Sequence, residues 1–213
     1  KTVKGPLKVD CIYRRLDDNF LDPKAFFKGS LIGVPGLFKS WRKGNVGILN
    51  AIGTGIADDK VVYSYVNKMI VYYLGEQPIL NQVETYLCHD EIQKNYVIDN
   101  ISKLVVKPAN ASGGYGIMIG PKAPKEEREE VIKKIKKNPR EYIAQPLETL
   151  STAPTITRDD IEPRHLDLRP FILSGKSTYV TTGGLTRVAL RKGSTIVNSS
   201  QGGGSKDTLV VDV

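Results

Sequence analysis

Cysteine is scarce in this chain, with only Cys11 and Cys88 among its 213 residues. Two cysteines so far apart support neither a disulfide framework nor a cysteine-based zinc site. Long apolar runs are missing, and no stretch has the features of a signal peptide. We therefore expect a protein without a membrane partner and take the cytoplasm as its expected compartment.

The composition is that of an ordinary globular protein, with 40% hydrophobic and 25% charged residues. A chain of this length can form one large or two small domains with a sizeable core. The sequence begins at Lys1 without a methionine, residues 7–13 already resemble an interior strand, and residues 208–213 form an apolar end. These features predict a fragment of a longer protein.

Positive charge is plentiful but dispersed, with a net charge of +8. The densest basic run, 133–137, follows the acidic run 126–130 on a predicted helix over 124–138. Acidic residues first and basic residues last complement the helix dipole. This order favours a solvated helix face over a nucleic-acid-binding patch, so no nucleic-acid partner is expected.

The most informative stretch is 104–120, which predicts two strands joined by a glycine-rich hairpin tip. Leu104 to Val106 are aliphatic and suit a buried strand. Pro108 ends regular pairing because it has no N–H group. Lys107 follows the apolar residues, where burial of its charge is costly unless an anion lies nearby. The small residues of the tip allow close approach of a ligand to the backbone.

Two interpretations of this hairpin stay open on the residues alone. The lysine and the backbone N–H groups of the tip could hold a nucleotide phosphate. Alternatively, the stretch is a common hairpin whose lysine extends to solvent. It is not a Walker loop, because Lys107 precedes the glycines. Nor is it a Rossmann fingerprint, since a strand follows the glycines in place of a helix.

The segment 14–23 sets two arginines among three aspartates and also leaves two interpretations open. It is either a self-neutralising surface turn or a contact to an anionic group or substrate by one arginine, oriented by the neighbouring carboxylates. Further along, a strand over 46–50 and a glycine-rich turn precede a helix over about 58–74, with Asp58 or Asp59 as its N-cap. The other expected elements are a helix near 37–41, a connecting segment 96–100, strands 142–147, 165–173 and 177–182, a hairpin of 186–190 with 194–198, and a polar, flexible 198–207.

Several segments in a fixed order carry a resemblance to a known family. The chain resembles the circularly permuted branch of the ATP-grasp superfamily and is similar to glutathionylspermidine synthase. The segments are YRRLDDNFLDP (13–23), GTGIADDK (53–60), VKP (106–108), DLRPF (167–171), GGLTRVA (183–189) and NSSQGGGSKD (198–207).

The resemblance implies an α+β fold with two sheet-containing subdomains and ATP between them. We expect a strand–helix layer unit over 1–103 that contains the Lys60 segment. A glycine-flap subdomain would cover 104–147, and 148–213 would form the C-terminal sheet of the ATP-grasp core.

The resemblance also assigns roles to residues. Lys60 and Lys107 would contact ATP, and Gln145 would contact the adenine together with neighbouring backbone groups. Arg169 and Arg187 would stabilise the transferred phosphoryl group. The mobile flap over the phosphates would consist of Ser112, Gly113, Gly114, Tyr115 and Gly116.

The implied activity is that of an ATP-dependent carboxylate–amine or carboxylate–thiol ligase. It would work through an acyl phosphate on small carboxylate and amine substrates, of peptide or polyamine type, with ATP and Mg²⁺. The acidic Leu-Glu-Asp-Asn motif of the branch is absent here, so the metal ligands are expected before Lys1. Asp167 and Asn198 have suitable oxygen chemistry, and a structural role is equally open for both.

Without those ligands, the fragment itself is expected to be inactive. A non-catalytic nucleotide-binding or scaffold protein of the same fold is the alternative function.

Overall fold

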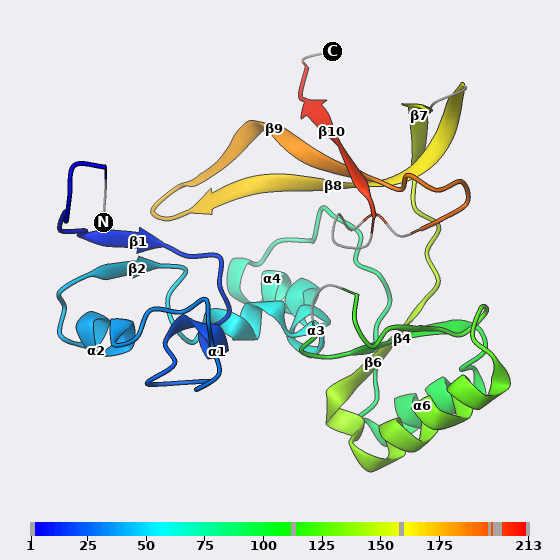
Figure 1. Cartoon of the computed structure of the whole chain (residues 1–213). Coiled ribbons are helices and arrows are strands. Elements are labelled where there is room, and N and C mark those ends of the chain that lie inside the picture. Colours follow the sequence, from blue (N-terminus) through cyan, green and yellow to red (C-terminus); the bar gives the residue numbers. More distant parts are fainter. Residues whose placement is uncertain (1–2, 112–113, 158–159, 196, 198–201, 212–213) are drawn as a thin grey trace. The chain divides into compact units, whose positions relative to one another are not determined.

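The computed structural model describes residues 3–111, 114–157, 160–195, 197 and 202–211. The chain separates into two compact units, Lys1–Gln82 and Val83–Val213. Figure 1 shows the elements of each unit in chain order.

The first unit is built from short elements. Strands β1 (Cys11–Tyr13) and β2 (Gly47–Leu49) pair in parallel, as Cys11 with Gly47 and Tyr13 with Leu49. Both lie inside the predicted strands. The helical elements of this unit are α1 (Asp18–Leu21), α2 (Leu37–Arg42), η1 (Thr54–Asp58), α3 (Lys60–Tyr63) and α4 (Val66–Leu74).

The helix predicted over about 58–74 is divided in two. Asp59 caps α3, since its side chain accepts a hydrogen bond from the backbone N–H of Val61 at 2.7 Å. A turn follows α3, in which both the backbone N–H and the hydroxyl of Ser64 donate to Val61 O, the hydroxyl at 2.7 Å. A serine that bonds its own backbone competes with the helical pattern, and α4 starts two residues later.

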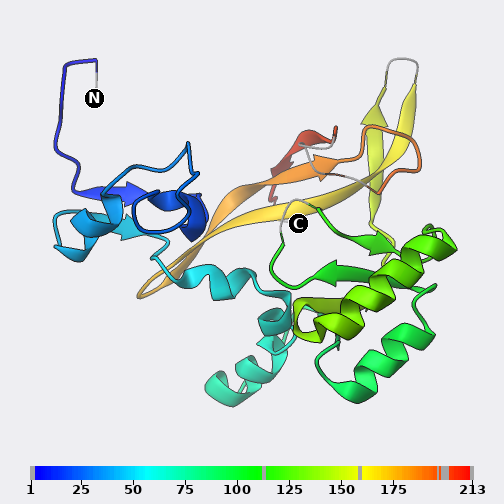
Figure 2. The same cartoon turned by 60° about the horizontal axis from the view of Figure 1, so that its bottom comes forward.

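The second unit contains a four-stranded antiparallel sheet in the order β3-β6-β4-β5. Its core side packs Val97 and Ile135, both fully buried, against Leu104, Val106 and Ala144. Because the first two lie on α5 and α6, both helices cover the same face of the sheet (Figure 2). The elements are β3 (Tyr86–Leu87), α5 (Glu91–Asp99), β4 (Leu104–Pro108), β5 (Met118–Ile119), α6 (Lys125–Lys137), η2 (Pro139–Glu141) and β6 (Tyr142–Pro146).

The segment 96–100, expected as a connection, lies mostly within α5. Asp90 caps this helix by accepting a hydrogen bond from Gln93 N at 2.9 Å, and the Gln93 side chain accepts from Leu87 N at 2.8 Å. The Gln93 side chain thus ties the start of the helix to β3, since it bonds to Leu87 in place of the N–H of the cap residue. Only Val97 is buried along the helix, so the sequence offered little apolar periodicity to recognise it.

A second antiparallel sheet has the order β10-β9-β8-β7. Its long hairpin joins β8 (Ile161–Ser174) to β9 (Thr178–Val188), and β7 (Thr152–Ile156) and β10 (Gly204–Leu209) flank it. The expected hairpin of 186–190 with 194–198 was wrong. Among the described residues of 194–198 there is no strand, and β9 pairs with β10 instead.

The fold class is confirmed as a mixture of helices and antiparallel sheets. The three expected domain ranges stay a prediction, although β3 joins its sheet from before residue 104. None of the helices in the described ranges is long and apolar enough to cross a membrane.

Candidate functional site

The face of β4 and β6 that points away from the core carries two of the predicted nucleotide-binding residues, Lys107 and Gln145. Strand alternation places Leu104 and Val106 towards the helices, so Lys107 projects from the opposite face. In the antiparallel register Lys107 pairs with Ile143, which makes Gln145 its diagonal neighbour on the same face. The structure therefore brings Lys107 and Gln145 together.

A continuous line of polar contacts on this face runs from β4 across β6 to the residue that precedes β3. Lys107 Nζ donates to Gln145 Oε1 at 2.6 Å, and Gln145 Nε2 donates to Thr85 Oγ1 at 2.9 Å. Gln145 is buried, with 7% of its surface exposed, and Lys107 is half-buried. The Gln145 side-chain amide is thus held in one orientation, because its oxygen accepts from Lys107 and its nitrogen donates to Thr85. The neutral amide fixes the direction of the lysine ammonium.

Thr85 was not among the predicted site residues. It directly precedes β3, whose two residues, Tyr86 and Leu87, are too few to show strand alternation. Only the pairing of Tyr86 with Ala144 brings Thr85 beside Gln145. Its place in the site is therefore a product of the tertiary fold.

The glycine-rich hairpin tip lies next to Lys107 along the chain. Ser112 and Gly113 fall outside the described residues. Gly114 and Gly116 have φ angles of 82° and 72°, in the left-handed region that favours glycine. A Cβ at Gly116 would also come within 2.9 Å of Pro108 Cγ. Tyr115 between them is 72% exposed, so the described part of the tip presents an aromatic side chain to solvent.

Lys60 belongs to the other unit, as the first residue of α3. Burial lowers the pKa of its ammonium group, and the charges of Asp59 and Asp58 partly oppose this effect. The structure does not bring Lys60 and Lys107 together within one unit.

Arg187 and Asp167 face each other across β9 and β8. Arg187 Nε donates to Asp167 Oδ1 at 2.8 Å, and Nη2 donates to Oδ2. This bidentate pair lowers the pKa of Asp167 and raises that of Arg187. Arg169, two residues along the same face as Asp167, is exposed. Asn198 falls outside the described residues. The described ranges contain no group of three potential metal-ligating side chains.

The fold and the site define a mixed α+β protein with an ordered lysine–amide pair beside a glycine-rich hairpin. Residues 1–189 match the family described as circularly permuted ATP-grasp type 2. This chain belongs to that family, which confirms the resemblance of its motifs.

Relatives extend over almost the whole chain. An uncharacterised protein of Synechocystis sp. is 58% identical over 212 residues, covering 99% of this chain and 44% of its own length. A Mycobacterium tuberculosis protein, also uncharacterised, is 52% identical over 212 residues, which cover 99% of this chain and 38% of that protein. A Frankia casuarinae protein named "Putative glutamate--cysteine ligase 2-2" is 48% identical over 95% of this chain and 23% of its own length. The chain thus spans about two fifths of the first two relatives.

Proposed function

We propose that this chain forms part of an ATP-dependent ligase that joins a carboxylate to an amine or a thiol through an acyl phosphate. Two observations support the proposal: membership of the ATP-grasp family and the ligase name of the Frankia relative. That name refers to the joining of glutamate to cysteine, which is the same class of reaction. Substrates of peptide or polyamine type are therefore proposed here.

The observation that carries the proposal is the polar line from Lys107 through Gln145 to Thr85. An ammonium held by a buried amide is preorganised to contact a phosphate, because little side-chain freedom is left to lose on binding. We assign Lys107 to the phosphates of ATP and Gln145 to the adenine. The hairpin tip, Ser112 to Gly116, would close over the phosphates, and Lys60 would approach from the other unit, with the nucleotide between the subdomains.

Arg187 and Arg169 are proposed to act on the transferred phosphoryl group. Phosphoryl transfer depends on positioning and on stabilisation of the charge on the equatorial oxygens. The pair with Asp167 fixes the Arg187 guanidinium, and exposed Arg169 lies on the same face of the sheet. Exposed Arg169 can therefore meet an anionic substrate directly, and Arg187 would contribute its charge from the fixed position of its pair with Asp167.

Mg²⁺, when bound, neutralises charge on the phosphates of ATP. Asp167 fits such an ion by its donor chemistry, because each carboxylate oxygen has two acceptor sites and Arg187 occupies one on each. Asn198 is the second proposed ligand. The arginine pair would then orient the carboxylate towards the ion.

The activity can be tested by incubating the full-length protein, of which this chain is proposed to form part, with ATP, Mg²⁺ and pairs drawn from panels of carboxylates and amines. ADP release and the new amide product are followed together. We expect ADP release that depends on both substrates. ATP hydrolysis that is indifferent to carboxylate and amine, with no amide formed, would contradict a ligase.

A further inference from the structure

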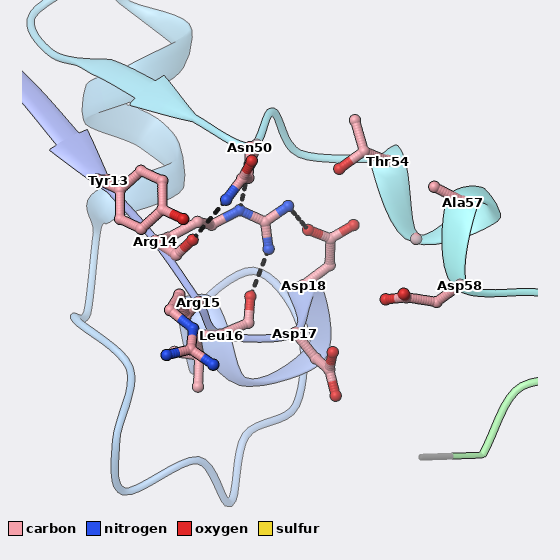
Figure 3. A pocket seen from close by; sticks show the side chains of 11 residues that line it. Tyr13, Arg14, Arg15, Leu16, Asp17, Asp18, Asn50, Thr54, Ala57 and Asp58 are labelled. Carbon is pink, nitrogen blue, oxygen red and sulfur yellow. Dashed lines mark hydrogen bonds and ion pairs between the residues drawn. The ribbon is translucent and has the colours of Figure 1, made fainter. Parts of the chain in front are cut away.

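The first unit contains a polar pocket of about 560 Å³ between the end of β1 and the η1 turn. Its volume lies within the ~300–1,000 Å³ typical of small-molecule sites. Figure 3 shows the side chains that line it, with Arg15 and Asp58 drawn on opposite sides. All residues of this lining lie in the segment 13–18, at Asn50, or in the segment 54–58.

Arg14 forms part of the pocket framework. It is buried, and its guanidinium donates to three backbone carbonyls, those of Asn50, Leu16 and Ala51, at 2.5–2.7 Å. It also lies 2.6 Å from Asp18 Oδ1, while Asp18 Oδ2 accepts from Gly53 N at 2.8 Å. These contacts anchor Arg14 and balance its charge, so Arg14 and Asp18 belong to the wall of the pocket. Asp18 Oδ1 is buried there and has no hydrogen-bond partner among the described residues.

Arg15, Asp17 and Asp58 have a different environment. Each lines the pocket and is exposed, and none of them forms an ion pair with another described residue. Figure 3 shows the Asp58 carboxylate across from Arg15, with the Asp17 carboxylate drawn between them. The pocket therefore offers one cation and two anions to whatever enters it.

This arrangement favours a particular ligand chemistry. A carboxylate matches a guanidinium by bidentate hydrogen bonding, and an ammonium matches the pair of aspartates. A divalent metal is not favoured, because the described residues contain no group of three acidic, histidine or cysteine side chains close enough to bind one. With Arg14 and Asp18 paired, the remaining charged side chains of the lining are Arg15, Asp17 and Asp58, and Lys60, outside the lining, interacts with the charge of Asp58. The pocket therefore favours a ligand that carries both a carboxylate and an amine.

We propose that this pocket binds an amino acid or short peptide, with its carboxylate at Arg15 and its amine at Asp17 and Asp58. The proposal rests on the ligase function above, since it assigns the pocket to the amine-bearing substrate. It also decides between the two interpretations of the segment 14–23: Arg14 is the structural arginine, and Arg15 is the substrate-contacting arginine.

L-Lysine and cadaverine are suitable probes, because they differ in the single carboxylate of lysine. Binding is measured by calorimetry and located by amide chemical shifts. We expect lysine to bind at least about tenfold more tightly than cadaverine, the gain of one charge-assisted hydrogen-bonded pair. Arg15→Gln should reduce lysine affinity to that of cadaverine and leave cadaverine unchanged, and Asp58→Asn should weaken both about tenfold.

Lys43→Gln and Asp10→Asn are matched controls, since both positions are exposed in the same unit outside the pocket lining. Shifts confined to other residues, equal affinity for the two probes, or losses in the controls equal to those at Arg15 and Asp58 would overturn the proposal, as would a lack of saturable binding. ATP binding is measured in parallel. Normal ATP binding without lysine binding would reject this inference alone, whereas lysine binding without ATP binding would reject the ligase function.

Discussion

The two units of this protein are held together by different interactions. Among the described residues of Lys1–Gln82, the buried apolar side chains are only Leu21, Ile48 and Val61. Buried polar residues are as prominent there: Arg14, Asp22, Ser30 and Asp59. The sheet of the second unit instead packs a continuous apolar cluster against α5 and α6.

Asp22 illustrates how the first unit replaces apolar burial. It is almost fully buried, and its carboxylate accepts from the backbone N–H groups of Lys24, Gly36 and Phe38 at 2.8–3.0 Å. One side chain therefore joins α1, α2 and the loop between them. The two units thus differ in what holds them: apolar packing supports the sheet that carries Lys107, and buried hydrogen bonds hold α1 and α2 of the first unit.

The largest expected effect on stability is in the apolar sheet. Ile135→Ala should lower the free energy of unfolding by about 2–5 kcal/mol, because a fully buried side chain leaves a cavity. Ile92→Ala is the matched control, since Ile92 also lies on a helix of this unit but is 82% exposed. Urea unfolding followed by circular dichroism measures both. Equal losses would show that burial in this cluster does not decide stability.

The hydrogen-bonded framework should respond to loss of a carboxylate. Asp22→Ala leaves three backbone N–H groups without their acceptor and should cost about 1–3 kcal/mol. Trp41 is the single tryptophan of the chain and lies on α2, so its fluorescence reports on this unit. Exposed Asp10 provides the control, Asp10→Ala. An unchanged midpoint for Asp22→Ala would show that the framework does not depend on this carboxylate.

A smaller effect is expected from acid. Burial acts to raise the pKa of Asp22, but the three backbone hydrogen bonds outweigh it and hold the pKa below its ordinary value. A lowered folded-state pKa gives stability that is present above the unfolded pKa of ~3.9 and is lost as the pH falls through the folded pKa. The urea midpoint of unfolding, followed by Trp41 fluorescence, should therefore decrease as the pH is lowered below about 4.

Asp22→Asn removes this titration, so its midpoint should depend less on pH over the same range. Asp10→Asn should keep the pH dependence of the original protein. A slope that Asp22→Asn leaves unchanged would assign the acid sensitivity to other carboxylates.

The sequence predicted those elements whose pattern is local. The apolar run at Leu104 became β4, and the acid-to-base order over 124–138 became α6. Asp59 could be predicted as a cap because N-capping depends on a side chain and the next few backbone groups. The pairing of Arg187 with Asp167 was not predicted, since it depends on the register of two distant strands.

The parts that failed depend on partners far away in the chain. Strand β10 contains Ser205, Lys206 and Asp207, with no apolar alternation to identify it, and forms by pairing with β9. The polar composition of 198–207 therefore predicts a flexible segment in place of a strand. The sequence could not distinguish Arg14 from Arg15 either. The two side chains are identical, and they differ only because backbone carbonyls surround the Arg14 guanidinium.

The central claim is that the Lys107 face of the sheet binds ATP, and calorimetry of ATP binding to Lys107→Ala tests it most directly. A charge-assisted contact contributes about 1.5–3 kcal/mol, so the affinity should fall tenfold or more. Lys136→Ala, at an exposed position on α6 of the same unit, should bind ATP as the original protein does. Equal ATP affinity for Lys107→Ala and Lys136→Ala would contradict the account.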